Sequence, residues 1–224
     1  MKYFIDSANP EKIKRIMEYY PVDGVTTNPT IVARENTEFL PLMKEIRALC
    51  ADKTMFVQVT AKTADEMVRE AKLMIQALGG ELCIKIPATE EGLKAIKSLS
   101  CAGVRTTATA VYSVQQALLC AAAGAEYVAP YMSHIDNMCV DSAEIAGEMA
   151  KLFTTHFPKT HVLAASFRIA EQINRVILAG ADAVTVAPEM FPTLMSSNMT
   201  SAELGSFEKN WSAVYGNRSV ADLI

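Results

Sequence analysis

The sequence lacks the features that mark membrane, secreted and zinc-binding proteins. No apolar stretch approaches the roughly 20 residues needed to cross a bilayer, and the apolar run near the N-terminus is shorter than that of a secretory signal. The five cysteines are odd in number and form no CxxC pair, which favours reduced thiols over disulfides or zinc. The three histidines lack the spacing of a metal motif. We therefore expect a cytoplasmic protein with no bound metal.

An excess of positive charge is also missing. The 224 residues include 21 lysines and arginines against 25 aspartates and glutamates, which gives a net charge of −4. Nucleic acids and anionic membranes bind to concentrated positive surfaces. The charge balance therefore argues against both as partners, but it permits a local basic pocket for one small phosphate.

Strand and helix patterns alternate along the chain. Most strand candidates are almost continuously apolar, as in a parallel sheet buried on both faces. Helix-start signals stand at Asn9–Pro10–Glu11, at Thr63 with Glu66, and at Thr89. Glycines that fit helix ends are Gly103, Gly124 and Gly180. The candidate strands are Tyr3–Asp6, Gly24–Thr26, Met55–Val59, Leu82–Ile86, Val104–Thr109, Tyr127–Pro130, His161–Ser166 and Ala183–Val186.

This alternation predicts a single (β/α)8 TIM barrel domain over residues 1–224 with an extra C-terminal helix. The strands recur at intervals close to a βα unit of about 30 residues, and no linker rich in Gly, Pro or Ser divides the chain. Residues from about 200 to 224 form the helical tail, in which Phe207, Trp211 and Tyr215 have helical spacing. A doubly wound open sheet is the alternative, although no GxGxxG or P-loop follows any strand.

Polar residues stand at the C-terminal ends of the predicted strands, where TIM barrels build their active sites. Each one alone is unremarkable, but their occurrence on seven successive strands is informative. They are Asp6, Thr26, Thr27, Asn28, Gln58, Thr60, Lys85, Thr107, Thr109, Tyr131 and Ser166.

Lys85 is the most specific member of this set. It lies between apolar residues in a strand expected to be buried, where a lysine must pair with a carboxylate or lose its hydration. Desolvation lowers an ammonium pKa, and the neutral amine can form a Schiff base with a carbonyl. The alternative is a structural ion pair, with Asp6 as the partner.

The other candidates also have structural alternatives. Asp6 could hold a catalytic water or anchor a loop, and Asn28 before Pro29 is typical of a turn. The Gln58 amide in an apolar strand needs hydrogen-bond partners. Tyr131 could move a proton or be a half-buried aromatic with a satisfied hydroxyl.

Ser166 and Arg168 form a candidate phosphate site. A serine hydroxyl and backbone amides could supplement the guanidinium there. The alternative for Arg168 is a solvated residue at the start of a helix.

Four segments resemble the transaldolase family: Phe4–Ala8, Val25–Thr30, Ile84–Thr89 and Ala164–Arg168. Their order and spacing match the short bacterial members over essentially the whole chain. The resemblance implies a (β/α)8 barrel with Schiff-base aldol chemistry on Lys85 and no metal or other cofactor. The family's aspartate and asparagine correspond to Asp6 and Asn28.

Two further positions resemble the fructose-6-phosphate aldolase branch. True transaldolases have Glu and Phe where this chain has Gln58 and Tyr131, and the aldolases have Gln and Tyr. His134 departs from the pattern, because aldolases of this type commonly carry arginine there. Histidine is shorter and only partly protonated near neutrality, so phosphate binding could rest more on Arg168 and Ser166.

The resemblance implies reversible cleavage of fructose 6-phosphate to dihydroxyacetone and glyceraldehyde 3-phosphate. The mechanism expected has Tyr131 moving protons with a water held by Gln58, Thr109 and Asp6, while Thr26 and Asn28 orient the donor hydroxyls. The partners expected are sugar phosphates, dihydroxyacetone and copies of this chain, in a decamer of two pentameric rings. Three alternatives stay open: a transaldolase of the pentose phosphate pathway, an isomerase or epimerase without a covalent lysine, and a catalytically silent sugar-binding barrel.

Overall fold

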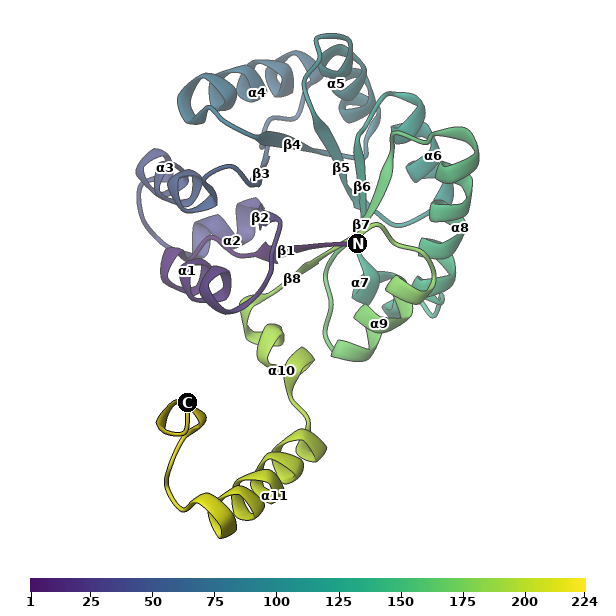
Figure 1. Cartoon of the computed structure of the whole chain (residues 1–224). Helices are drawn as coiled ribbons and strands as arrows, with labels where there is room; N and C mark the ends of the chain where they lie inside the picture. The colour runs from purple at the N-terminus through teal and green to yellow at the C-terminus, as the bar shows by residue number, and fades with distance from the viewer. The chain divides into compact units, whose positions relative to one another are not determined.

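The computed structural model describes residues 1–224. The chain forms two compact units, Met1–Phe191 and Pro192–Ile224. In the first unit a closed ring of parallel strands is surrounded by helices (Figure 1). Each strand pairs with the next one along the chain, and the eighth pairs with the first. The predicted (β/α)8 barrel is confirmed, and a doubly wound open sheet is excluded because that sheet has two free edges.

All eight predicted strands are present, with small differences at their ends. Strand β5 begins at Thr106 instead of Val104, and β7 ends at Ala164, so that Ser166 lies beyond it. The strands are β1 Lys2–Asp6, β2 Gly24–Thr26, β3 Thr54–Gln58, β4 Leu82–Pro87, β5 Thr106–Val111, β6 Tyr127–Pro130, β7 His161–Ala164 and β8 Ala183–Val186.

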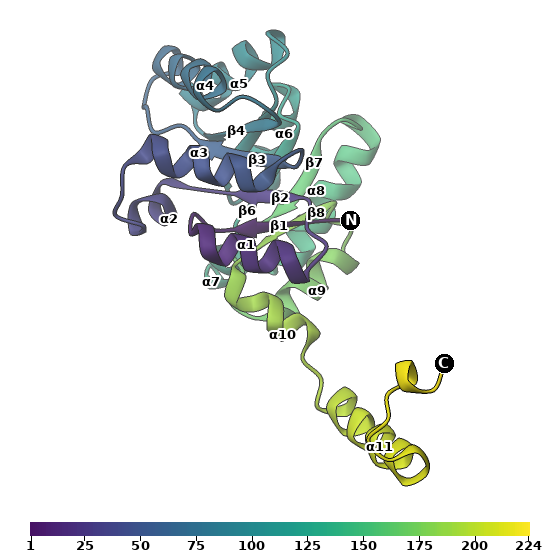
Figure 2. The same ribbon diagram turned by 60° about the vertical axis from the view of Figure 1, so that its left-hand side comes forward.

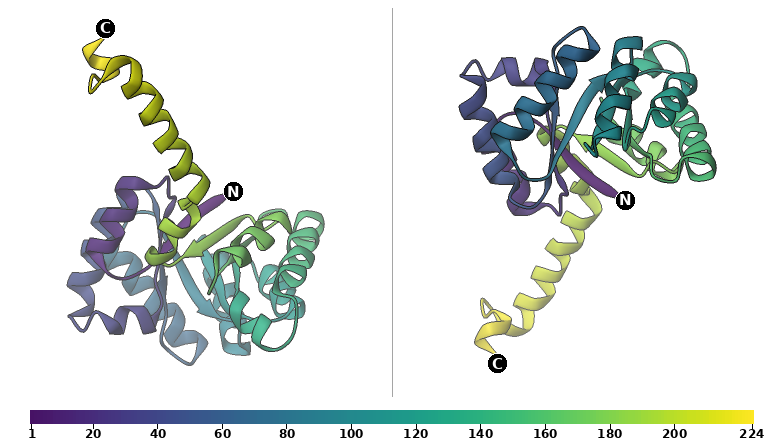
Figure 3. Two further views of the ribbon diagram at one scale, coloured as in Figure 1. Left: turned by 90° about the horizontal axis from the view of Figure 1, so that it is seen from below. Right: turned by 90° about the horizontal axis from the view of Figure 1, so that it is seen from above.

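The helices lie on the outside of this barrel. Helices α4 and α5 are neighbours there (Figure 2), and α8 packs between α6 and α9. Seen from below and from above the view of Figure 1, the helices again lie outside the strands (Figure 3). The helices of this unit are α1 Pro10–Tyr19, α2 Pro29–Arg34, α3 Phe39–Cys50, α4 Ala64–Leu78, α5 Glu90–Cys101, α6 Val114–Ala122, α7 Met132–Asn137, α8 Ser142–His156, α9 Ala170–Leu178 and the 3-10 helix η1 Pro188–Met190; α10 Phe191–Met195 spans the boundary between the units.

Local sequence signals account for most helix ends. The side chains of Asn9 and Thr89 accept hydrogen bonds from the first turns of α1 and α5, as N-caps do. The Thr63 hydroxyl instead donates to the Glu66 carboxylate at 2.7 Å and makes no cap bond to the backbone. The glycines predicted to end helices all have positive φ, 74° at Gly103, 99° at Gly124 and 107° at Gly180.

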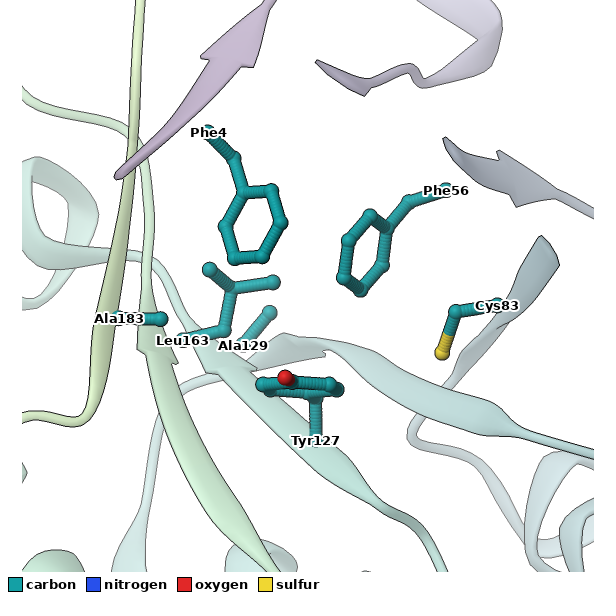
Figure 4. Packing of buried hydrophobic residues seen from close by; sticks show 7 residues of the cluster. All are labelled: Phe4, Phe56, Cys83, Tyr127, Ala129, Leu163 and Ala183. Carbon is teal, nitrogen blue, oxygen red and sulfur yellow. The ribbon is translucent and has the colours of Figure 1, made fainter. Parts of the chain in front are cut away.

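Aromatic rings fill the barrel below the site. The rings of Phe4, Phe56 and Tyr127 point toward one another (Figure 4), and Phe56 meets the other two edge-on at centroid distances of 4.9 and 5.4 Å. Side chains two residues apart on a strand face the same way. The interior position after Phe56 is therefore Gln58, and the one after Cys83 is Lys85. Toward the C-terminal ends of the strands, the apolar layer inside the barrel is thus followed by a polar layer.

The second unit consists mainly of α11 (Asn198–Tyr215), followed by the 3-10 helix η2 (Val220–Asp222). The predicted C-terminal helix is confirmed. Ser197 caps its start, and the Trp211 indole N–H donates to the Arg218 carbonyl at 2.6 Å. That this chain forms one domain remains a prediction. None of the helices combines the length and the apolar character needed to span a membrane.

Candidate active site

A cavity of about 680 Å³ opens at the C-terminal ends of the strands. Most of the predicted site residues line it, although they come from six different strand ends and the loops after them. Thr26 and Thr109 do not line it, but each bonds to a residue that does. The predicted residues on its wall are Asp6, Asn28, Gln58, Lys85, Tyr131, His134, Ser166 and Arg168.

Lys85 lies at the base of this cavity on β4. The residue is 4% exposed, and its amine donates a hydrogen bond to the Thr27 carbonyl at 2.9 Å. No carboxylate oxygen lies within 4.0 Å of the amine, so the structural ion pair with Asp6 is not formed. Burial lowers the pKa of Lys85, and the negative charge of Asp6 opposes that shift. The amine is therefore biased toward its neutral, nucleophilic form.

Asp6 belongs to a short chain of hydroxyl contacts. The Thr26 hydroxyl donates to the Asp6 carboxylate at 2.8 Å, and it lies 2.5 Å from the hydroxyl of Thr185 on β8. Thr185 also lines the cavity, and sequence reasoning missed it. The sequence feature that could have indicated Thr185 is its hydroxyl, the single polar side chain in the otherwise apolar strand Ala183–Val186. These contacts hold the Asp6 carboxylate at the wall of the cavity.

Tyr131 follows β6 and reaches back to β5. Its hydroxyl lies 3.0 Å from that of Thr109. Burial raises the pKa of Tyr131, while the bond with Thr109 lowers it. The phenol consequently keeps its proton near neutral pH and can donate it.

Gln58 ends β3 and has an unsatisfied side chain. Its Oε1 atom is buried and has no hydrogen-bond partner within the protein. An orphaned buried acceptor is costly unless a water or a ligand donates to it. Because Gln58 lines the cavity, that donor would be a molecule bound there.

A second polar cluster joins the ends of β6 and β7. The Ser166 hydroxyl lies 3.0 Å from the Ser133 hydroxyl and 3.1 Å from Nδ1 of His134. Ser166 has a φ of +64°, an uncommon value for a residue with a side chain. Arg168, which is exposed, forms no ion pair and lines the same cavity. This end of the cavity can receive an anion.

Asn28 has a structural role as well as a place in the cavity. Its side-chain oxygen accepts a hydrogen bond from the Ile31 amide at 3.1 Å and caps α2, and Pro29 begins that helix. The turn chemistry expected before a proline is therefore present. The Asn28 side-chain NH2 group can still donate to a ligand in the cavity.

Sequence reasoning also missed the rim of the cavity. The Lys12 amine pairs with Glu189 at 2.6 Å, and the Asn9 side chain donates to Glu35 at 2.9 Å. Arg34 lines the same edge. No sequence signal distinguished these groups, because solvated charges occur throughout the helices.

A second cavity of about 950 Å³ lies at the other ends of the strands, among the loops that precede β5, β6 and β7. Its main cation, Arg105, is already neutralised by Glu126 at 2.7 Å and Glu81 at 3.0 Å. This second cavity contains no buried lysine. The cavity that Lys85 lines is therefore the better candidate for covalent chemistry. No group of three or more His, Cys, Asp or Glu side chains is arranged to hold a metal ion.

Comparison with known proteins adds independent evidence. The family model described as transaldolase/fructose-6-phosphate aldolase matches residues 3–219. The chain belongs to this family. A probable transaldolase from Lactiplantibacillus plantarum is 40% identical over 95% of this chain and 97% of its own length. Another, from Symbiobacterium thermophilum, is 37% identical over 96% and 99%.

A solved structure supports the fold alone. A thiamine phosphate pyrophosphorylase from Pyrococcus furiosus aligns with a TM-score of 0.61 over 83% of this chain and 85% of its own length. The two sequences are only 16% identical. Shared architecture at this identity carries no statement about the reaction.

Proposed function

We propose that this transaldolase-family member is a class I aldolase that reversibly cleaves fructose 6-phosphate to dihydroxyacetone and glyceraldehyde 3-phosphate. One observation carries the proposal: a buried lysine without a carboxylate partner faces a cavity that it shares with Gln58 and Tyr131. The lowered pKa of Lys85 supplies the neutral amine that attacks a ketone.

The proposed reaction begins with attack of the Lys85 amine on C2 of the sugar phosphate. Loss of water leaves an iminium ion. A proton then leaves the C4 hydroxyl, the C3–C4 bond breaks, and its electrons enter the iminium to form an enamine while glyceraldehyde 3-phosphate departs. Protonation of the enamine at C3 and hydrolysis of the resulting iminium release dihydroxyacetone and restore the amine.

Tyr131 is proposed to carry the proton between these steps. Its hydroxyl is held by Thr109, and the raised pKa keeps the proton available near neutral pH. The unpartnered Gln58 oxygen would accept a hydrogen bond from the water that hydrolyses the iminium. Gln58 itself cannot act as a Brønsted acid or base.

Two groups of residues would bind the ends of the substrate. Asp6, held by Thr26, and Asn28 would orient the hydroxyls of the three-carbon donor. Arg168 would contact the phosphate with its guanidinium, and Ser166 and His134 would add hydrogen bonds. In this proposal the Lys85 amine forms the only covalent bond to the substrate, and no step uses a cofactor or metal.

The deciding experiment is an assay of purified protein with fructose 6-phosphate, run with and without erythrose 4-phosphate. An aldolase releases free dihydroxyacetone without an acceptor. If no free dihydroxyacetone appears and glyceraldehyde 3-phosphate is released only as erythrose 4-phosphate is converted to sedoheptulose 7-phosphate, the protein is a transaldolase.

Transaldolase activity is the second candidate, because both related proteins carry the name probable transaldolase. Such an enzyme would transfer the dihydroxyacetone unit between sugar phosphates of the pentose phosphate pathway. The presence of Tyr131 and Gln58 favours the aldolase, since a phenol can protonate the enamine and end the reaction without an acceptor.

Borohydride trapping separates both Schiff-base activities from an isomerase, an epimerase or a sugar-binding barrel. Reduction in the presence of dihydroxyacetone should leave a covalent adduct on Lys85, visible by mass spectrometry of the intact protein and its peptides. The Lys85→Met variant is the matched control. A wild-type protein that forms no adduct would rule out both Schiff-base activities.

We also infer a cytoplasmic enzyme that assembles from copies of this chain. The reduced cysteines are compatible with the cytoplasm. α11 has no buried residue, although it carries several large apolar side chains. An uncovered apolar face of this kind favours contact with another protein surface, and a copy of this chain is the proposed partner.

A further inference from the structure

Tyr112 lies beside the active site without lining the cavity. It follows β5 directly, and its backbone amide is held by the Gln116 side chain at 2.9 Å. Its ring meets the ring of Tyr131 edge-on, with centroids 5.8 Å apart and planes at 78°. The same ring lies 6.2 Å from that of His134. Tyr112 therefore touches two proposed functional side chains but not the space that a substrate would occupy.

An irregularity in β5 brings Tyr112 to this place. The register of β5 against β6 shifts between Ala108 and Val111, and Ala110 has a φ of +56°. After the shift the Val111 carbonyl accepts a hydrogen bond from the Tyr131 amide at 3.2 Å. The Thr109 hydroxyl contacts the Tyr131 hydroxyl from the same segment. Strained backbone of this kind persists where the surrounding structure requires it, often at functional sites.

The three rings form one cluster. Tyr131 and His134 are themselves 5.5 Å apart, and His134 contacts the Ser166 hydroxyl at 3.1 Å. One end of the cluster is thus the proposed proton carrier, and the other is the proposed phosphate end. A displaced Tyr112 ring would leave both Tyr131 and His134 without a packing partner on that side.

We propose that Tyr112 is a positioning residue that sets the orientation of both Tyr131 and His134. The inference rests on the proposed function, since it assigns Tyr112 a role through the residue that moves the proton. The Tyr112 ring, and not its hydroxyl, holds Tyr131 and His134 in this proposal, because no hydrogen bond joins the Tyr112 hydroxyl to either neighbour. Loss of the ring should slow proton transfer while leaving Schiff-base formation on Lys85 intact.

The test compares Tyr112→Leu and Tyr112→Phe with wild type. Exchange of the C3 protons of dihydroxyacetone with D2O, followed by NMR, reports the proton step, and borohydride trapping reports the Schiff base. Tyr112→Leu should slow exchange by about tenfold or more with unchanged trapping, and Tyr112→Phe should stay within about twofold of wild type. Tyr19→Leu makes the same change at a side chain that is 70% exposed and should have no effect. If the leucine variant does not fold, Tyr112→Met fills the space with a flexible side chain and carries the same expectation.

A double-mutant cycle decides whether Tyr112 acts through Tyr131. In a Tyr131→Phe background, Tyr112→Leu should cause little further loss of exchange, because residues that work through one another are not additive. An equal fold-loss in both backgrounds, or wild-type exchange in Tyr112→Leu, would overturn the proposal.

The phosphate end gives a second readout. In the synthetic direction Tyr112→Leu should raise KM for glyceraldehyde 3-phosphate more than for unphosphorylated glyceraldehyde, and this difference should shrink in a His134→Ala background. Equal changes for both aldehydes would overturn the link to His134. Wild-type protein that neither traps an adduct nor exchanges protons would overturn the proposed function together with this inference. If the wild-type protein traps the adduct and exchanges protons, and Tyr112→Leu exchanges protons at the same rate, the inference alone would be overturned.

Discussion

Lys85 and Arg168 are two cations with opposite surroundings. The Lys85 amine is buried with a lowered pKa and one carbonyl partner, whereas Arg168 is exposed at the rim. Burying an amine lowers the stability of the folded protein, but the neutral form that burial favours is a good nucleophile. An exposed guanidinium keeps its charge and its planar donors, which suits phosphate. Burial therefore separates the proposed covalent role of Lys85 from the proposed binding role of Arg168.

Replacing Lys85 by methionine should raise stability and abolish activity. In the folded state the pKa of Lys85 lies below its ordinary value of 10.5, so the unfolded chain binds more protons between these two pKa values. Wild-type stability consequently contains a penalty that shrinks as pH rises through that interval. Lys85→Met should gain about 0.5–2 kcal/mol at pH 7, and the gain should diminish by pH 10. Urea unfolding at the two pH values measures it, and a less stable variant at pH 7 would contradict the expectation.

Replacing Arg168 by glutamine should weaken the binding of phosphorylated substrates selectively. Hydrogen bonds to charged groups contribute about 1.5–3 kcal/mol, which corresponds to an increase in KM for fructose 6-phosphate of roughly 10- to 100-fold. Proton exchange into unphosphorylated dihydroxyacetone should change little. Steady-state kinetics with both substrates checks this, and an equal loss for both would show that Arg168 does not bind the phosphate.

Among the helices and strands, the junction between β4 and α5 is the one that holds Lys85 in place. Thr89 caps α5, and the helix starts so close to β4 that a Cβ at Gly92 would lie 1.9 Å from the Pro87 carbonyl oxygen. Only glycine permits this approach. The tight packing fixes the end of the strand from which the Lys85 side chain projects into the cavity.

Substituting Gly92 by alanine should therefore damage both stability and catalysis. The new methyl group must push α5 away from β4, and overpacking of this kind costs about 1–3 kcal/mol or more. Movement of β4 should also lower kcat. The matched control is Gly205→Ala, because nothing lies within 4 Å of a Cβ at that position in α11. That change should be neutral or stabilise the helix by about 0.5–1 kcal/mol. Thermal unfolding and kinetics of the two variants test the contrast.

At the scale of the whole molecule, α11 stands out because none of its residues is buried in the single chain. Its exposed apolar side chains recur at helical spacing and include Met199, Phe207, Trp211 and Tyr215. Exposing such a stripe to water is unfavourable, so a surface of another chain is expected to cover it.

A charge on this stripe should weaken self-association. Phe207→Glu places a carboxylate among the apolar side chains and should lower the mass measured by light scattering at micromolar concentration. Lys209→Glu introduces the same residue on the opposite side of the helix and should leave the mass unchanged. A monomeric wild-type protein, or a Phe207→Glu variant with unaltered mass, would contradict the proposed assembly.

The sequence by itself determined the order of the elements and much of the candidate site. Apolar runs of strand length, helix caps and helix-ending glycines are local signals, and the structure confirmed all eight strands. Lys85 stood out because a lysine between apolar residues is costly wherever it is buried. The ends of β5 and β7 were less predictable, because pairing with neighbouring strands decides where a strand ends.

Only the tertiary structure decided how these residues meet. Closing the barrel brings β8 beside β1 and places Thr185 against Thr26, a contact between residues far apart in the chain. The absence of an ion pair at Lys85 and the placement of Tyr112 against Tyr131 also depend on strand register. Register and closure are set by long-range backbone pairing and side-chain packing, which no local pattern contains. The sequence therefore singled out Lys85 as the candidate nucleophile, and the fold decided which side chains meet around the candidate site.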